Sequence, residues 1–92
     1  MSAFRLSKTH SMPREDLRET ARALASRLEA QHGMRARWQG EDVVAIKGSG
    51  VEGRLSIDDG EIAIDVKLGM LASAFQGRLR AEIQRYLDDN IS

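Results

Sequence analysis

Polar and apolar residues alternate over short stretches along most of this chain. Phe4 and Leu6 flank the polar Arg5, a pattern that predicts a short strand at a sheet edge. Asp59-Gly60 favours a two-residue hairpin turn between two of the later alternating segments. Four further strands, joined as a meander, are predicted at residues 34–38, 43–47, 54–58 and 62–68.

Two segments instead carry apolar residues at helical spacing. The first runs from about Pro13, which suits a first helical turn, to about His32, and Gly33 can cap its end. The second follows Gly69 directly. Their expected inward stripes are Leu17, Ala21, Leu24 and Leu28 in the first helix, and Leu71, Phe75, Leu79, Ile83, Tyr86 and Leu87 in the second.

The predicted element order is β-α-β-β-β-β-α within one domain over residues 1–92. We therefore expect an α+β fold, with an antiparallel meander sheet and both helices packed on one of its faces. The other sheet face should point toward water or a partner, and its predicted polar residues are Arg35, Arg37, Asp65 and Lys67.

Charge and composition exclude several classes of function. The chain has 14 Lys and Arg residues and 14 Asp and Glu residues, so it has no net positive charge that could attract a nucleic acid. The absence of Cys excludes disulfides, thiolate nucleophiles and cysteine zinc sites. No window approaches the roughly 20 apolar residues of a transmembrane segment, and no secretory signal is visible, so we expect a cytoplasmic protein. A neutral chain also permits a homo-oligomer, formed through the strand edge at residues 4–8 or through the polar sheet face.

Two motifs imitate ligand sites. The segment 48–53 reads G-x-G-x-x-G, but a strand is predicted after it where a dinucleotide site needs a helix, so we interpret it as a hairpin bend or a bulge. Asp58-Asp59-Gly60-Glu61 lacks the spaced oxygen ligands of a calcium loop and is interpreted as a hairpin turn. We expect no metal and no cofactor.

The two histidines give no catalytic arrangement. His10 and His32 lie near opposite ends of the first predicted helix, about 30 Å apart by helical rise, and cannot share a metal. No nucleophile motif accompanies either one, so the sequence predicts no enzymatic activity. An enzyme would require a polar cluster around His10 or the acidic turns that the sequence does not reveal.

Trp38 and Phe75 are the aromatic candidates for contact with a partner or ligand. Trp38 precedes a turn, where it can either lock the sheet against a helix or anchor a partner, and the core position is favoured. Phe75 could line an apolar groove with Met70, Leu71 and Leu79, although stripes of this kind usually belong to the core. The full set of candidate contacts is His10, Arg35, Arg37, Trp38 and Phe75.

Five short elements occur in a characteristic order: His10, Ala21, Trp38-Gln39-Gly40-Glu41-Asp42, Gly50-Val51-Glu52-Gly53 and Leu68-Gly69. In this series the chain resembles the polyhydroxyalkanoic acid system family of small bacterial proteins. The resemblance spans nearly the whole chain. It implies an association with bacterial storage of polyhydroxyalkanoate polyesters, and it implies neither an enzymatic activity nor catalytic residues.

Two functional hypotheses follow. The first is a non-enzymatic accessory protein, associated with granules in the cytoplasm, that binds the polyhydroxyalkanoate granule or a granule protein through the open sheet face or an exposed apolar edge. The second is a small carrier that holds an apolar acyl group between the C-terminal helix and the sheet. Ninety-two residues leave little volume for both a core and a pocket.

Overall fold

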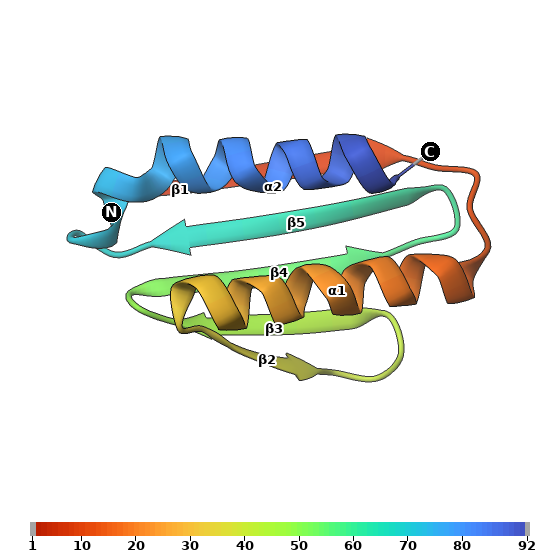
Figure 1. Ribbon diagram of the computed structural model, residues 1–92, viewed down its shortest axis with the longest axis horizontal. Helices are drawn as coiled ribbons and strands as arrows, with labels where there is room; N and C mark the ends of the chain where they lie inside the picture. Colours follow the sequence, from red (N-terminus) through yellow and green to blue (C-terminus); the bar gives the residue numbers. More distant parts are fainter. Residues whose placement is uncertain (1, 92) are drawn as a thin grey trace.

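A five-stranded antiparallel sheet organises the computed structural model, which describes residues 2–91 (Figure 1). The elements are β1 (Ser2–Thr9), α1 (Arg14–His32), β2 (Arg35–Trp38), β3 (Val43–Gly48), β4 (Val51–Ile57), β5 (Glu61–Leu68), the single 3₁₀ turn η1 (Ala72–Phe75) and α2 (Gln76–Asn90). The expected α+β class is confirmed. Of the single domain expected over residues 1–92, Met1 and Ser92 lie outside the described residues.

The strands lie in the order β1-β5-β4-β3-β2. The chain therefore begins at one edge of the sheet, crosses through α1 to the opposite edge, and returns by consecutive hairpins until β5 pairs with β1. This arrangement confirms both the meander and the edge position of the first strand.

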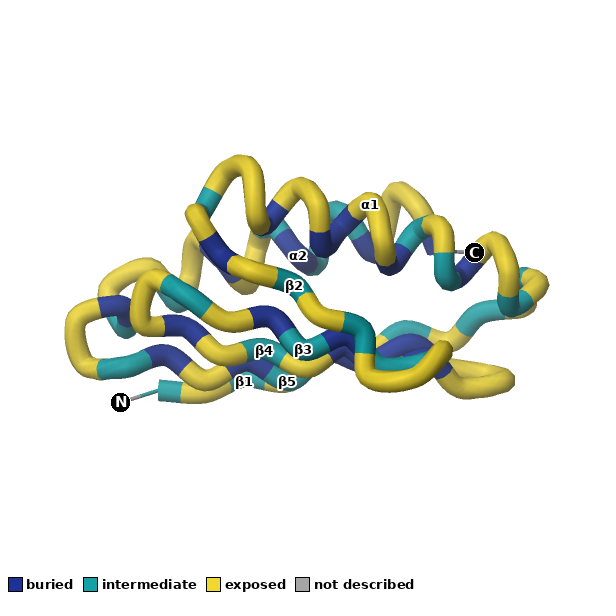
Figure 2. Tube along the Cα trace, turned by 90° about the horizontal axis from the view of Figure 1, so that it is seen from below, coloured by how far each residue is buried: buried dark blue, intermediate teal, exposed yellow. Residues whose placement is uncertain are grey.

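Both helices cover the same face of the sheet (Figure 2). Helix α1 contacts β2, β3 and β4, while α2 contacts β1, and the two helices run in opposite directions (Figure 1). The second face of the sheet carries no helix. One side of the sheet is therefore core and the other is open.

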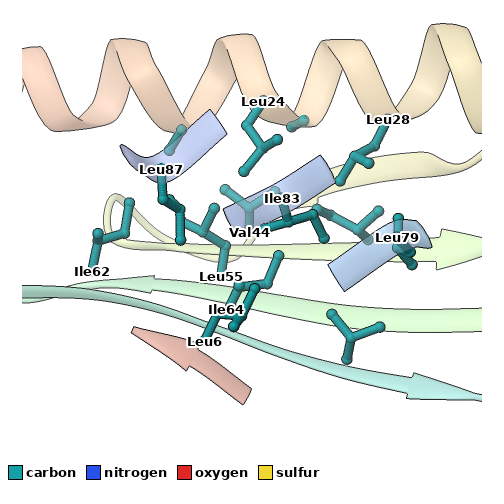
Figure 3. Close-up of a cluster of buried hydrophobic side chains, with 14 of the residues drawn as sticks. Leu6, Leu24, Leu28, Val44, Leu55, Ile62, Ile64, Leu79, Ile83 and Leu87 are labelled. Atoms are coloured by element: carbon teal, nitrogen blue, oxygen red, sulfur yellow. The ribbon is translucent and has the colours of Figure 1, made fainter. Parts of the chain in front are cut away.

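The core between helices and sheet is entirely apolar within residues 2–91, where no polar or charged residue is buried. Leu55 of β4 and Val44 of β3 are 0% exposed and lie beneath Leu24 of α1 and Ile83 of α2 (Figure 3). The stripe expected in α1 is buried at all four positions: Leu17, Ala21, Leu24 and Leu28.

The glycine-rich segment forms the β3–β4 hairpin and precedes no helix. Ser49 and Gly50 have φ angles of 56° and 76°, the positive values that a tight two-residue hairpin turn requires at both central positions. The strand resumes at Val51, whose side chain is buried. The predicted bend over 48–53 was therefore too long, because residues 51–53 belong to β4.

The predicted start of the last helix was wrong. Helix α2 begins at Gln76, and residues 72–75 form the separate 3₁₀ turn. Leu71 is 92% exposed and Phe75 is 58% exposed, so neither belongs to the buried stripe. Ala72 takes the inward position instead, since it faces Gly50, where a Cβ atom would lie only 3.4 Å from the Ala72 Cβ.

Ion pairs fasten the start of α1 to two turns at one end of the sheet. The Arg14 guanidinium lies 2.7 Å from Asp42 and also bonds Asp59, which joins the β2–β3 turn to the β4–β5 turn. Arg18 reaches Glu41 at 3.2 Å and Asp42 at 3.5 Å. The hydrogen bond from Arg14 holds the pKa of Asp42 below its ordinary value.

Replacing Leu55 tests the position of the core. We expect Leu55→Ala to lower the free energy of unfolding by about 2 to 5 kcal/mol, because the truncation leaves a cavity beneath both helices. The matched control Leu71→Ala should change it by less than about 0.5 kcal/mol, because that side chain is exposed. Urea denaturation measures both values, and equal losses would mean that Leu71 is packed.

Replacing Asp42 tests the ion pairs at the end of the sheet. A lowered folded-state pKa stabilises the folded chain above the unfolded-state value of about 3.9, and this stabilisation is lost as the pH falls through the folded-state value. The urea midpoint of Asp42→Asn should therefore lie below that of the unmodified chain near pH 7, and the gap should shrink as the pH falls below about 3.9. Asp58→Asn, in a neighbouring turn, serves as the control. A gap that keeps its size in acid would contradict the assignment.

Candidate functional site

Large exposed apolar side chains gather where the chain leaves β5. Met70 is 84% exposed, Leu71 92% and Phe75 58%, and all three belong to the segment 70–75. We call these three residues the apolar patch. Exposed apolar residues that cluster in this way are typical of an interaction site.

Backbone contacts hold the patch in place. The Gly69 N–H donates to the Gly50 carbonyl at 2.8 Å, and the Ser73 N–H and hydroxyl both donate to the Gly69 carbonyl at 2.9 Å. The hydroxyl of Ser2 donates to that of Ser73 at 3.1 Å. The segment is thus fixed both to the β3–β4 turn and to the start of β1, and these bonds keep the patch side chains outside the core.

A small hollow of about 220 Å³ lies beside Phe75. Its lining consists of the buried Met34, Val51 and Leu79, together with His32, Ser49, Phe75 and Arg78 nearer the surface. The groove considered from the sequence is present in part, because Phe75 and Leu79 line the hollow whereas Met70 and Leu71 do not.

The polar groups around this hollow are mostly engaged within the chain. Ser49 donates its hydroxyl to the His32 carbonyl at 2.8 Å, and the His32 ring lies 3.0 Å from Glu82 on α2. Arg78 is exposed and has no carboxylate within 4.0 Å in the described part of the chain. Arg78 is therefore the cation available to a ligand there.

The open face of the sheet is rich in basic side chains. Strand register places Arg37, Ala45, Arg54 and Asp65 in one row across β2, β3, β4 and β5, and Arg35 begins the next row. We call this surface the basic face. Its six basic residues are Arg5, Arg35, Arg37, Lys47, Arg54 and Lys67, and its three acidic residues are Glu52, Glu61 and Asp65.

Only part of this charge is paired. Arg5 bonds Asp65 at 2.6 Å, and Lys47 lies 3.3 Å from Glu52. The remaining basic residues of the face have no carboxylate within 4.0 Å among residues 2–91, and they are Arg35, Arg37, Arg54 and Lys67. Sequence reasoning selected Arg35 and Arg37 but did not identify Arg54 as part of the same cluster.

His10 and Trp38 make contacts within the chain. The Nδ1 atom of His10 accepts the Met12 N–H at 3.3 Å, which leaves Nε2 to donate to the Asp58 carbonyl at 2.8 Å. Trp38 is half-buried, lies on the helix-covered side opposite Val44, and packs against the core. Partner contacts through His10 or Trp38, and self-association through β1, stay predictions.

Shifted pKa values occur where α2 meets the rest of the fold. Partial burial raises the pKa of Tyr86, whose ring stacks under Arg27 and whose hydroxyl donates to the Thr20 carbonyl at 3.3 Å. Hydrogen bonds from Lys8 and Gln84 lower the pKa of Asp88. These groups join α2 to α1 and β1. Tyr86 and Arg27 also line a hollow of about 300 Å³ between the two helices.

Residues 2–91 contain neither a cluster of metal-binding side chains nor a helix that could span a membrane. No three His, Asp or Glu side chains come close enough together to hold a metal ion. Neither helix combines the length and the apolar character that crossing a membrane requires.

The comparison with protein families gives one match over nearly the whole chain. The model of the family described as "Putative polyhydroxyalkanoic acid system protein" matches residues 4–91. The matched range contains every strand in large part, both helices, the apolar patch and the basic face. No curated protein and no solved structure matches the chain.

Proposed function

Since the chain belongs to the family of polyhydroxyalkanoic acid system proteins, we propose that it is a non-enzymatic accessory protein that binds the surface of polyhydroxyalkanoate granules. The observation that carries this proposal is the apolar patch of Met70, Leu71 and Phe75. The proposal also assigns the protein to granules in the bacterial cytoplasm.

The chemistry of the polymer matches the patch. A polyhydroxyalkanoate is a polyester without charged groups along its chain, so a protein must hold it mainly by burying apolar area. Full burial of a Leu, Met or Phe side chain contributes about 1.5 to 3 kcal/mol. Scaled by their exposed fractions of 84%, 92% and 58%, the three side chains supply about 3.5 to 7 kcal/mol before the cost of immobilisation, which suits a reversible association.

The polar groups near the patch support a role without catalysis. The Ser49 hydroxyl bonds a backbone carbonyl, and the Ser73 hydroxyl does the same. The His32 ring faces Glu82 and not a hydroxyl. Activation of a serine requires a base within hydrogen-bond reach, and neither of these serines has a histidine ring as partner.

Removing the patch tests granule binding. In a fluorescent fusion, Leu71→Ser combined with Phe75→Ser should abolish the granule rims that the unmodified chain forms in a polyester-accumulating bacterium. On purified granules, the bound fraction should fall at least tenfold. Both side chains are largely exposed, so the fold should be retained.

Two controls accompany this experiment. Glu19→Ser combined with Gln84→Ser changes two surface positions outside the patch and should leave the rims intact. A polymer-negative strain should show diffuse fluorescence. Diffuse signal of the unmodified chain in both strains, or rims that persist in the patch variant, would overturn the proposal.

The hollow beside Phe75 supports a second candidate function, the carriage of a short acyl group. Met34, Val51 and Leu79 offer apolar walls, and Arg78 offers a cation for a carboxylate. The volume of about 220 Å³ lies below the roughly 300 Å³ at which ordinary ligand pockets begin. A ligand would therefore be a short hydroxyacyl acid and not a long fatty acid.

Titration with 3-hydroxyoctanoate tests this candidate. Binding in the hollow should shift the backbone amide resonances of Met34, Val51 and Leu79 in nitrogen-15 NMR spectra. Arg78→Gln should weaken the binding about tenfold, whereas Arg80→Gln, an exposed arginine outside the hollow, should not. Unchanged spectra at millimolar ligand would exclude the carrier function while leaving granule binding untouched.

A further inference from the structure

The chain has no net charge, so the basic face is positive because basic and acidic residues are distributed unequally over the surface. Lys plus Arg and Asp plus Glu are equal in number over the whole chain, yet the open side of the sheet holds six basic and three acidic residues. We propose that this face docks an acidic segment of a partner protein. The proposal stands on this surface alone and does not depend on granule binding.

Three of the four arginines of the face differ from those of α1 in their pairing, while Arg5 is paired with Asp65. Each of the four α1 arginines has a carboxylate within 4.0 Å, and these are Arg14, Arg18, Arg22 and Arg27. On the open face, Arg35, Arg37 and Arg54 have none within the described residues. Three guanidinium groups on the open side of the sheet are thus free to bind carboxylates from outside the chain.

These three arginines lie in a defined arrangement. Arg35 and Arg37 are two residues apart on β2, which separates them by about 7 Å along the strand. Arg37 and Arg54 share a row with Ala45 between them, so two strand spacings of about 9.5 Å in all separate them. The arrangement is a triangle of cations fixed by the sheet backbone.

A shallow depression lies beside this triangle. Ala45 contributes little side chain to the centre of the face, and a hollow of about 490 Å³ lies above it. The charged residues around that hollow are Lys47, Glu52, Arg54, Asp65 and Lys67, and its two carboxylates are already paired, Glu52 with Lys47 and Asp65 with Arg5. A partner segment can therefore settle between basic side chains.

An acidic helix fits the longer of these spacings. Side chains seven residues apart on a helix lie on the same side and are about 10.5 Å apart along its axis. This distance is close to the separation of about 9.5 Å between Arg37 and Arg54, so a helix lying across the strands can present one carboxylate to each of them. The guanidinium fork binds a carboxylate through two parallel hydrogen bonds, so each matched pair adds orientation as well as attraction.

A protein partner is favoured over a nucleic acid. Surfaces that bind single strands stack the bases on aromatic side chains. The two aromatic residues of the sheet, Phe4 and Trp38, lie on the helix-covered side opposite Val66 and Val44. The neutral chain also lacks the overall positive charge that attracts a phosphate backbone.

The test uses the full chain and a synthetic probe. The probe is a 16-residue alanine-based helical peptide with Glu at every third or fourth position, and its counterpart carries Gln at the same positions. Nitrogen-15 NMR should show shifts of the Arg35, Arg37 and Arg54 amides with the Glu peptide and none with the Gln peptide. Added salt should weaken the binding, because the attraction is electrostatic.

Matched variants separate this surface from charge in general. Arg37→Gln combined with Arg54→Gln should lower the affinity for the Glu peptide at least tenfold. Arg80→Gln combined with Arg85→Gln removes the same charge from α2 and should change the affinity less than twofold. Leu71→Ser combined with Phe75→Ser should leave peptide binding unchanged, which separates this proposal from granule binding.

Three outcomes would overturn the proposal. The α2 variant could lose affinity as much as the sheet variant, the Gln peptide could bind as well as the Glu peptide, or a twelve-residue oligothymidine could bind the same face more tightly than the Glu peptide. The last result would assign the surface to single-stranded nucleic acid.

Discussion

The pairing of β1 with β5 is the constraint on which the rest of this structure depends. It runs over the full length of both strands, from Ser2 opposite Leu68 to Thr9 opposite Glu61. The two strands are far apart in sequence, so their pairing closes a long loop at an entropic cost that local hairpins do not carry. Helix α2 packs on β1, and Lys8 of β1 lies 2.9 Å from Asp88 of α2. Without β1, the inward side of α2 would lose part of the apolar surface on which it packs.

The close approach of Gly50 and Gly69 determines which side chains of the segment 70–75 are exposed. The hydrogen bond between them brings the β3–β4 turn against the chain that leaves β5, and only a side chain as small as that of Ala72 fits beside Gly50. Leu71 is then left in solvent. The exposure of the patch is therefore a result of backbone packing at this contact.

The sequence predicted the elements well and their ends less well. Alternation identified all five strands because one face of the sheet is buried, which makes the pattern strict. The last helix was harder. At 100° per residue, Ala72 lies about 20° from Leu79 on a helical wheel and Leu71 about 80°. Alanine was thus the better-placed inward residue, but hydrophobicity favoured leucine. The contact with Gly50 that decides between them joins residues distant in sequence, and no local pattern contains it.

The candidate surfaces show that a chain without net charge can still carry a locally basic surface. Some of the acidic residues that balance the chain lie in the turns at one end of the sheet, where Arg14 pairs with Asp42 and Asp59, and Arg18 pairs with Glu41 and Asp42 (Figure 1). Those carboxylates are held by α1 and cannot reach the centre of the open face. Neutrality and a basic surface are therefore compatible. The two candidate surfaces also bind through different interactions. Contact through the apolar patch depends on buried area and resists salt, whereas contact through the basic face weakens as the salt concentration rises. One small domain can thus contact a polyester surface and an acidic protein segment through two independent surfaces.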